Sequence, residues 1–169
     1  MRKRCLVIVI VEDEPQEMLV RRYLRQHGLG SREMRFRSSP SGEGSAEQWV
    51  RRAFLEETRV YRNRHAQTKL IVMIDADTPT VQHRLRQLDQ ALIDNGKDRI
   101  DAAAEQIARL VPKRNVETWI LCLDGQGVNE ETDYKQTRDD WSELITPAAE
   151  TLFQYTRPNA QAPLCIDSL

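Results

Sequence analysis

The sequence predicts an α/β fold: a three-layer sandwich in which helices cover both faces of a mostly parallel, four-stranded sheet. Two observations carry this prediction. Short runs of valine, isoleucine and leucine alternate with longer segments whose apolar residues recur at helical spacing. Strands that alternate with helices pair in parallel through right-handed crossovers. A chain of 169 residues can bury one core, so we expect one domain over residues 1–155 and a proline-containing tail over residues 156–169.

The first strand and helix are expected directly after the N-terminus. Residues 5–11 form a nearly continuous apolar run, which is typical of a strand covered on both faces. Pro15 suits the first turn of a helix, apolar residues then recur every three or four positions, and Gly28 ends the pattern. The segment is therefore a predicted strand–loop–helix unit.

Two further strands flank the next helix. Met34 and Phe36 alternate with arginines, which predicts a short, half-exposed second strand. After a loop rich in serine and glycine, residues 49–61 show helical spacing. Residues 70–74 are apolar and β-branched and predict a buried third strand that ends at Asp75.

The second half of the chain is expected to be mainly helical, with one more strand. Residues 110–112 predict a short fourth strand, and Asn115 is a plausible N-cap for the helix that follows it. Alanine-rich or apolar-periodic segments predict the helices. These cover residues 85–92, 102–108, 116–123 and 141–155.

Four acidic residues stand at or near the points where apolar runs stop: Glu12, Asp75, Asp77 and Glu117. The carboxyl ends of parallel strands meet at one edge of a sheet, where ligands collect. Asp75 and Asp77 are two residues apart, so their side chains are expected to point the same way. Carboxylate oxygens suit Mg²⁺ or Mn²⁺ better than zinc, which predicts a site for one such ion, or for two if Glu117 faces it. The alternative is that Glu117 simply favours the start of a helix.

Basic residues are concentrated at the start of the chain. Residues 1–67 carry 14 Lys/Arg and 9 Asp/Glu, and 20 of the 25 basic residues are arginine, the better bidentate ligand of phosphate. These residues either follow a nucleic-acid backbone or form a solvated surface. The candidates for nucleic-acid binding are Arg21, Arg22, Arg25, Arg35, Arg37, Lys113 and Arg114. Lys135 is a further candidate for stabilising charge on a phosphoryl group.

The order of strands, helices and acids resembles the Toprim domain of topoisomerases, primases and the overcoming-lysogenization-defect nucleases, a Rossmann-like fold. Residues 9–12, 71–77 and 112–119 (VIVE, IVMIDAD and PKRNVETW) are more similar to stand-alone Toprim-like proteins that accompany ABC-type ATPases in bacterial antiviral defence. The resemblance covers residues 5–123. It departs from the Toprim pattern at Asp13, where a glycine usually follows the first glutamate.

The resemblance implies a Mg²⁺- or Mn²⁺-dependent nuclease acting on DNA, or alternatively on RNA. Glu12, Asp75 and Asp77 would hold the primary ion, and Glu117 would help a second ion or position water. Lys135 or Arg114 would contact the scissile phosphate. An ABC- or SMC-like ATPase is the implied partner, and self-association is left open.

A second resemblance competes with the first. Residues 11–15 and 74–79 (VEDEP and IDADTP) are also similar to the receiver domain of response regulators, in which an aspartate accepts a phosphoryl group on a Mg²⁺ site. Asp75 lies 63 positions after Glu12, farther than in typical receivers, and this spacing favours the Toprim resemblance. A non-catalytic binding module with the same fold is the third alternative.

The chain is expected to remain in the cytoplasm. No apolar run approaches the roughly 20 residues that span a bilayer. The first apolar run meets three acidic residues instead of a cleavage site, so it does not read as an export signal. Three cysteines far apart in sequence predict reduced thiols.

Overall fold

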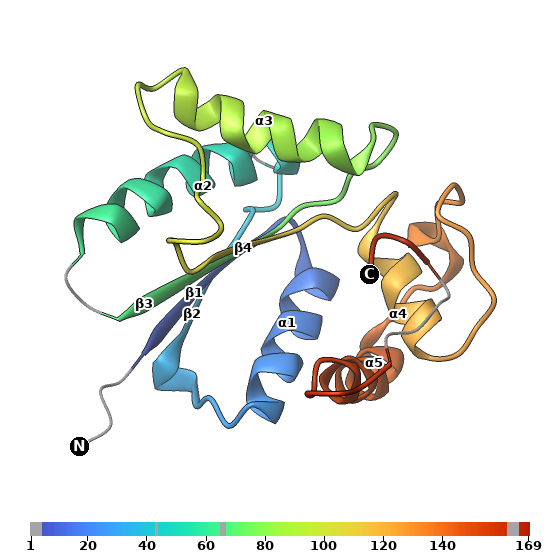
Figure 1. Cartoon of the computed structure of the whole chain (residues 1–169). Coiled ribbons are helices and arrows are strands. Elements are labelled where there is room, and N and C mark those ends of the chain that lie inside the picture. Colours follow the sequence, from blue (N-terminus) through green and yellow to red (C-terminus); the bar gives the residue numbers. More distant parts are fainter. Residues whose placement is uncertain (1–4, 43, 65–66, 162–165) are drawn as a thin grey trace.

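A four-stranded, all-parallel sheet forms the centre of the molecule (Figure 1). The computed structural model describes residues 5–42, 44–64, 67–161 and 166–169. The order along the sheet is β2-β1-β3-β4. The strands are β1 (Leu6–Val11), β2 (Met34–Ser38), β3 (Thr68–Met73) and β4 (Ile107–Leu110). The predicted α/β class with a parallel, Rossmann-like or Toprim-like sheet is confirmed.

Helices cover both faces of this sheet, which confirms the three-layer arrangement (Figure 1). One face carries α2 (Ala46–Asn63) and α3 (Val81–Ile93). The other carries α1 (Glu14–Gln26), α4 (Val116–Leu123) and α5 (Ser142–Tyr155), and two short 3-10 helices are η1 (Ser31–Glu33) and η2 (Lys135–Thr137). Among the helices of the described residues, none has the length and apolar character needed to cross a membrane.

The central strand β1 is buried on both faces, as its continuous apolar run predicts. Val7, Val9 and Val11 belong to the core beneath α1, α4 and α5. Ile8 and Ile10 belong to the core beneath α2 and α3. Because successive side chains of a strand point to opposite faces, one apolar run supplies both cores.

The start of α1 fixes the chain directly after β1. Asp13 is the N-cap, and its Oδ1 accepts a hydrogen bond of 3.1 Å from the backbone N–H of Gln16. Pro15 occupies the first turn, as predicted, where a missing N–H costs nothing. The first turn of α1 therefore lies at the carboxyl end of β1.

The helix expected over residues 102–108 is wrong. Asp101 Oδ1 instead accepts hydrogen bonds from the backbone N–H groups of Ala103 (2.9 Å) and Ala104 (3.3 Å), which forms a turn. β4 then begins at Ile107, earlier than the strand expected over residues 110–112, and pairs with β3. Alanine has the highest intrinsic helix propensity, but the Asp101 turn and the pairing of β4 with β3 outweigh it here.

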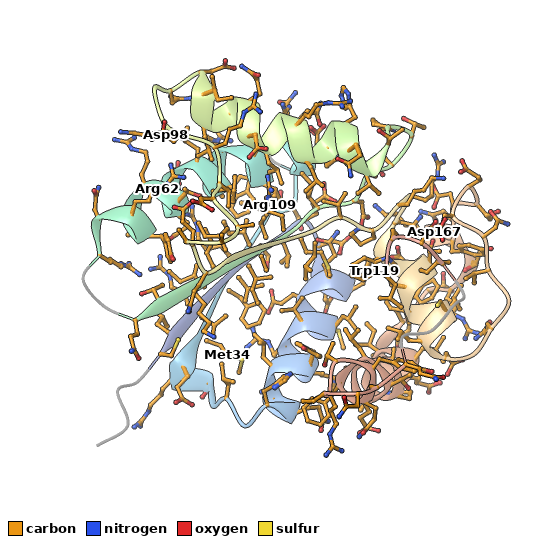
Figure 2. The ribbon with its side chains drawn as sticks, viewed as in Figure 1. Met34, Arg62, Asp98, Arg109, Trp119 and Asp167 are labelled. Atoms are coloured by element: carbon orange, nitrogen blue, oxygen red, sulfur yellow. The ribbon has the colours of Figure 1, made fainter. Side chains whose placement is uncertain are left out.

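The last residues of the chain return to the core. Ser168 Oγ accepts hydrogen bonds from Trp119 Nε1 (2.9 Å) and from the backbone N–H of Lys113 (3.2 Å). Trp119 lies on α4, beside the chain end that carries Asp167 (Figure 2). The C-terminus is thereby attached to the segment that links β4 to α4.

The cysteines differ from the expectation of three reduced thiols. Cys5 has a free thiol, whereas Cys122 on α4 is disulfide-bonded, so the expectation is wrong for Cys122. Cys165 lies outside the described residues.

Candidate functional site

Glu12 and Asp75 meet at the carboxyl edge of the sheet. β1 and β3 are neighbours in parallel register, and each is followed by one of these acids. Glu12 Oε2 accepts a hydrogen bond of 2.9 Å from the backbone N–H of Asp75. Both side chains are buried, and Asp75 is 0% exposed. Two of the acids singled out in the sequence therefore come together, although 63 positions separate them.

Gln16 bridges this pair. Its Nε2 donates hydrogen bonds to Asp75 Oδ1 (2.9 Å) and to Glu12 Oε2 (3.3 Å), while its Oε1 accepts one from the backbone N–H of Glu12 (2.9 Å). The side chain is fully buried. The sequence analysis missed this residue. The available signal was a glutamine one helical turn after Glu12 at the start of a predicted helix.

Lys135 supplies the positive charge nearest to the pair. Its Nζ lies 2.9 Å from Asp75 Oδ2. Burial by itself would lower the pKa of Lys135, but the adjacent Asp75 carboxylate, together with Asp13 and Asp77 nearby, raises this pKa. Lys135 is therefore held in its charged form at the site for which the sequence proposed it.

The segment that carries Lys135 is attached to the start of α4. Asp133 accepts hydrogen bonds from Asn115 Nδ2 (2.8 Å) and from the backbone N–H of Lys135 (3.0 Å). Arg114 Nη2 lies 3.7 Å from the second oxygen of Asp133. Asn115 is the N-cap residue of α4, but its side chain serves this contact instead of capping the helix. Arg114 and Lys135 are thus joined through one carboxylate.

Burial raises the pKa values of the two paired acids. The pKa of Glu12 is raised to about 7, although the Asp75 N–H and Lys135 oppose the effect of burial. Burial raises the pKa of Asp75 well above its usual range, against the attraction of Lys135. Both acids therefore lose solvation that their hydrogen bonds and one lysine only partly replace. A bound cation would compensate the remaining cost.

Glu117 lies in the first turn of α4 and is 3% exposed. Its Oε2 has no hydrogen-bond partner within the described part of the chain. Burial raises its pKa to about 7, Asp13 adds to this shift, and Lys135 opposes it. The carboxyl is thus in electrostatic range of Asp13 and of Lys135, which contacts Asp75. An acid that only stabilises the start of a helix can remain exposed, so this role alone does not explain the burial of Glu117.

Asp77 turns its carboxylate toward Arg84. Its backbone is left-handed (φ 54°), and its half-exposed carboxylate lies 3.6 Å from Arg84 Nη2. The buried Arg84 also donates a hydrogen bond of 3.3 Å to the Ala76 carbonyl. The sequence argument assumed extended backbone through Asp77, but β3 ends at Met73. Asp75 and Asp77 therefore do not form a ready-made site for one cation.

The oxygen atoms of these acids are suitable ligands for a divalent cation, but the side chains are not arranged around one. Over the residues that the structure describes, no three histidine, cysteine, aspartate or glutamate side chains are arranged to hold a metal ion. Lys135 faces Asp75 Oδ2, and Asp77 is paired with Arg84. The buried carboxylates are hard oxygen ligands of the kind that Mg²⁺ prefers. A metal could bind them only if Lys135 withdraws from Asp75.

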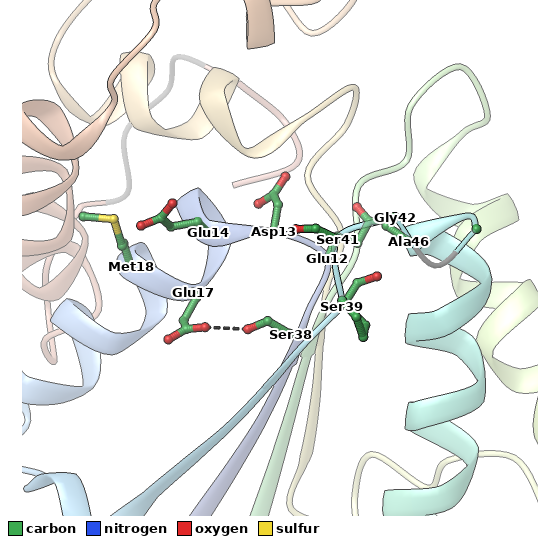
Figure 3. A pocket seen from close by; sticks show the side chains of 12 residues that line it. Glu12, Asp13, Glu14, Glu17, Met18, Ser38, Ser39, Ser41, Gly42 and Ala46 are labelled. Carbon is green, nitrogen blue, oxygen red and sulfur yellow. Dashed lines mark hydrogen bonds between the residues drawn. The ribbon is translucent and has the colours of Figure 1, made fainter.

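A cavity of about 560 Å³ opens beside Glu12 (Figure 3). Acidic residues at the start of α1 line one side, and serines and glycines of the loop before α2 line the other. Glu17 accepts a hydrogen bond from Ser38 Oγ across the cavity. No lysine or arginine is among its described lining residues. The cavity therefore offers oxygen atoms, and basic groups reach the site from the side of Lys135.

Several arginines proposed to bind nucleic acid are already paired with acids. Arg37 contacts Glu57 (2.9 Å) and Glu56 (3.0 Å). Arg21 contacts Glu17 (2.5 Å) and stacks over the ring of Phe36 (4.0 Å to its centre). These contacts neutralise the charge of Arg21 and Arg37.

The remaining basic candidates vary in exposure. Lys113 pairs with Glu131 on the surface. The side chain of Arg35 is 55% exposed, and its contact with Glu57 is long, with 4.0 Å between Nη2 and Oε1. Arg22 is half-buried and Arg25 is exposed, both on α1. The structure does not gather these residues into one patch with Lys135.

Comparisons with protein-family models, with curated proteins and with solved structures find no match to this chain. The class of protein is therefore defined by the fold and the site alone. It is an α/β protein with a parallel β2-β1-β3-β4 sheet and a buried acidic site at the carboxyl edge.

Replacing Glu117 tests the cost of its burial. An acid whose pKa rises from 4.5 to about 7 on folding contributes stability below pH 4.5 that is lost as pH rises through 7. We expect Glu117→Gln to be more stable than the native chain by about 1–3 kcal/mol at pH 8, in EDTA, with the difference vanishing near pH 4.5. Urea unfolding across this pH range measures it. Glu143→Gln, an exposed first-turn acid of α5, should show no such difference, and a Glu117→Gln protein less stable at pH 8 would contradict the prediction.

Replacing Lys135 tests the ion pair with Asp75. In Lys135→Met, Asp75 loses its nearest positive charge, and we expect a loss of about 1–3 kcal/mol in unfolding free energy at pH 8. The loss should shrink at low pH, because a protonated Asp75 needs no cation. Lys113→Met, which removes a surface pair, should have little effect. Equal stability of native and Lys135→Met proteins at pH 8 would show that the pair contributes nothing.

Proposed function

We propose that the chain is a Mg²⁺- or Mn²⁺-dependent nuclease of the Toprim type, which hydrolyses phosphodiester bonds of DNA or, alternatively, RNA. One observation carries the proposal. Glu12 and Asp75, from the ends of adjacent parallel strands, form a buried pair with Lys135 in contact and Glu117 in electrostatic range of this lysine. This is the sheet edge at which open α/β folds bind ligands.

In this proposal the acids hold the cations. Glu12, Asp75 and Asp77 bind the primary ion, and Glu117 helps to hold a second ion or positions water. A divalent ion bound there supplies an activated water and stabilises the charge of the phosphodiester. The raised pKa values of Glu12 and Asp75 support cation binding, because a cation offsets the cost of their buried negative charge.

Lys135 has two positions in this scheme. Lys135 neutralises Asp75 in the structure, and if a cation took its place at Asp75 Oδ2 it would contact the scissile phosphate, alone or with Arg114. Asp133 supports this assignment because it joins both basic residues.

The proposal includes a protein partner for capture of the nucleic acid. Arg21 and Arg37 are paired with acids, so these two candidates are less available to a phosphate backbone. The Toprim-like resemblance suggests an ABC- or SMC-like ATPase as this partner and antiviral defence as the setting. The chain would be the effector subunit.

Plasmid nicking tests the catalytic assignment. With Mg²⁺ or Mn²⁺ we expect the native chain to nick supercoiled DNA, and Glu12→Gln and Asp75→Asn to lose activity by about 100-fold or more, because each removes a cation ligand. Both changes keep the side-chain shape in a buried site. Asp89→Asn, which alters a surface pair with Arg109, should retain activity.

The outcomes separate the alternatives. Equal nicking by the native chain and the two site variants would refute the assignment of Glu12 and Asp75. No nicking by the native chain with either metal would refute a nuclease that works alone. No nicking even with the ATPase partner present would favour a non-catalytic binding module. Activity on single-stranded RNA in the same assay distinguishes the two substrate classes.

A second candidate function is a receiver-like phospho-acceptor. The ion pair between Lys135 and Asp75 favours it, because an ammonium group beside an acceptor carboxylate would also bind an incoming phosphoryl group. Asp75 is 0% exposed, however, which opposes attack on its carboxylate. The nuclease proposal is therefore preferred.

Acetyl phosphate with Mg²⁺ separates the two functions. If the nuclease proposal is correct, the intact mass of the native chain does not change. A gain of one phosphoryl group that is lost in Asp75→Asn and kept in Asp77→Asn would establish the phospho-acceptor instead.

A further inference from the structure

We infer that Gln16 is a positioning residue, which sets the orientation of both Glu12 and Asp75 and so determines which of their oxygen atoms face a bound cation. The inference rests on the proposed function for the nature of the ligand. Its structural basis is the set of hydrogen bonds that the Gln16 amide makes.

The Gln16 amide has only one workable orientation. A glutamine amide offers two N–H donors and a carbonyl acceptor. One donor goes to Asp75 Oδ1, the other to Glu12 Oε2, and the carbonyl accepts from the Glu12 N–H. A flipped amide would place its carbonyl oxygen against two carboxylates and its NH₂ against an N–H group. The orientation of the Gln16 amide is therefore fixed.

This bridge leaves one oxygen of each acid for other partners. Glu12 Oε2 is taken by Gln16 and by the Asp75 N–H, and Asp75 Oδ1 is taken by Gln16. Asp75 Oδ2 faces Lys135 Nζ, and Glu12 lines the cavity beside the site. Side chains that hydrogen-bond to metal ligands commonly orient them in this way, and their removal lowers metal affinity by about 10–100-fold.

The fold makes this position suitable for a bridging side chain. Asp13 caps α1 by accepting a hydrogen bond from the Gln16 N–H, so residue 16 lies one turn above Glu12 with its backbone fixed. Asparagine at this position would be one methylene shorter and could not span both acids. Methionine has nearly the same volume but no donor, so the two carboxylates would lose the groups that separate and orient them.

Direct Mn²⁺ binding tests the inference without requiring catalysis. We expect Gln16→Met and Gln16→Asn to bind Mn²⁺ about 10-fold or more weakly than the native chain, measured from the electron paramagnetic resonance signal of free Mn²⁺. Gln26→Met is the matched control, because Gln26 lies exposed at the far end of the same helix. Its Mn²⁺ affinity should equal that of the native chain.

A measurement on the native chain makes the test independent of variant folding. The side-chain amide signals of Gln16 in a ¹H–¹⁵N spectrum should shift as Mg²⁺ saturates the site, whereas those of Gln26 should not. A glutamine whose amide does not contact the ligands of the cation would not respond, and the affinities of the Gln16 variants then test whether this contact positions the ligands.

The results distinguish this inference from the proposed function. If the native chain binds Mn²⁺ and both Gln16 variants bind it equally well, or if the Gln16 amide signals ignore Mg²⁺ at saturation, the positioning role is overturned and the metal site stands. If the native chain binds no Mn²⁺, the proposed metal site is overturned and the inference with it.

Discussion

The burial of two carboxylates at the ends of adjacent parallel strands is the constraint on which the rest of the site depends. Parallel register brings Glu12 and Asp75 to the same sheet edge, where like charges out of water repel each other and lose solvation. Three donors stabilise the two carboxylates: the Asp75 N–H, the Gln16 amide and the Lys135 ammonium. Each comes from a different part of the chain, so the site cannot form before the tertiary structure does.

This arrangement gives the site a positive group of its own. The segment that carries Lys135 is attached through Asp133 to the start of α4, and the chain end is attached to the same region through Ser168. In the proposed function, a divalent cation and Lys135 compete for Asp75 Oδ2. Cation binding would then be coupled to movement of this segment, and the displaced ammonium would be free for the substrate phosphate.

The sequence predicted the α/β class, the parallel sheet and the edge at which the acids gather. The helix over residues 116–123 has the predicted bounds, because a clear apolar pattern defines it locally. The helix expected over residues 102–108 was wrong because the turn at Asp101 and the pairing of β4 with β3 outweigh the helix propensity of alanine. Gln16 was missed because its role exists only once Asp75 lies beside it.

The sequence by itself determined the order of elements, since periodicity and helix caps act between residues a few positions apart. It also determined which acids follow the strands. Only the tertiary structure decided that Lys135 rather than a second carboxylate contacts Asp75, that Asp77 turns to Arg84, and that Arg37 is paired with acids of α2. These contacts join residues far apart in the chain. Their formation depends on packing and on the cost of buried charge, which no local pattern records.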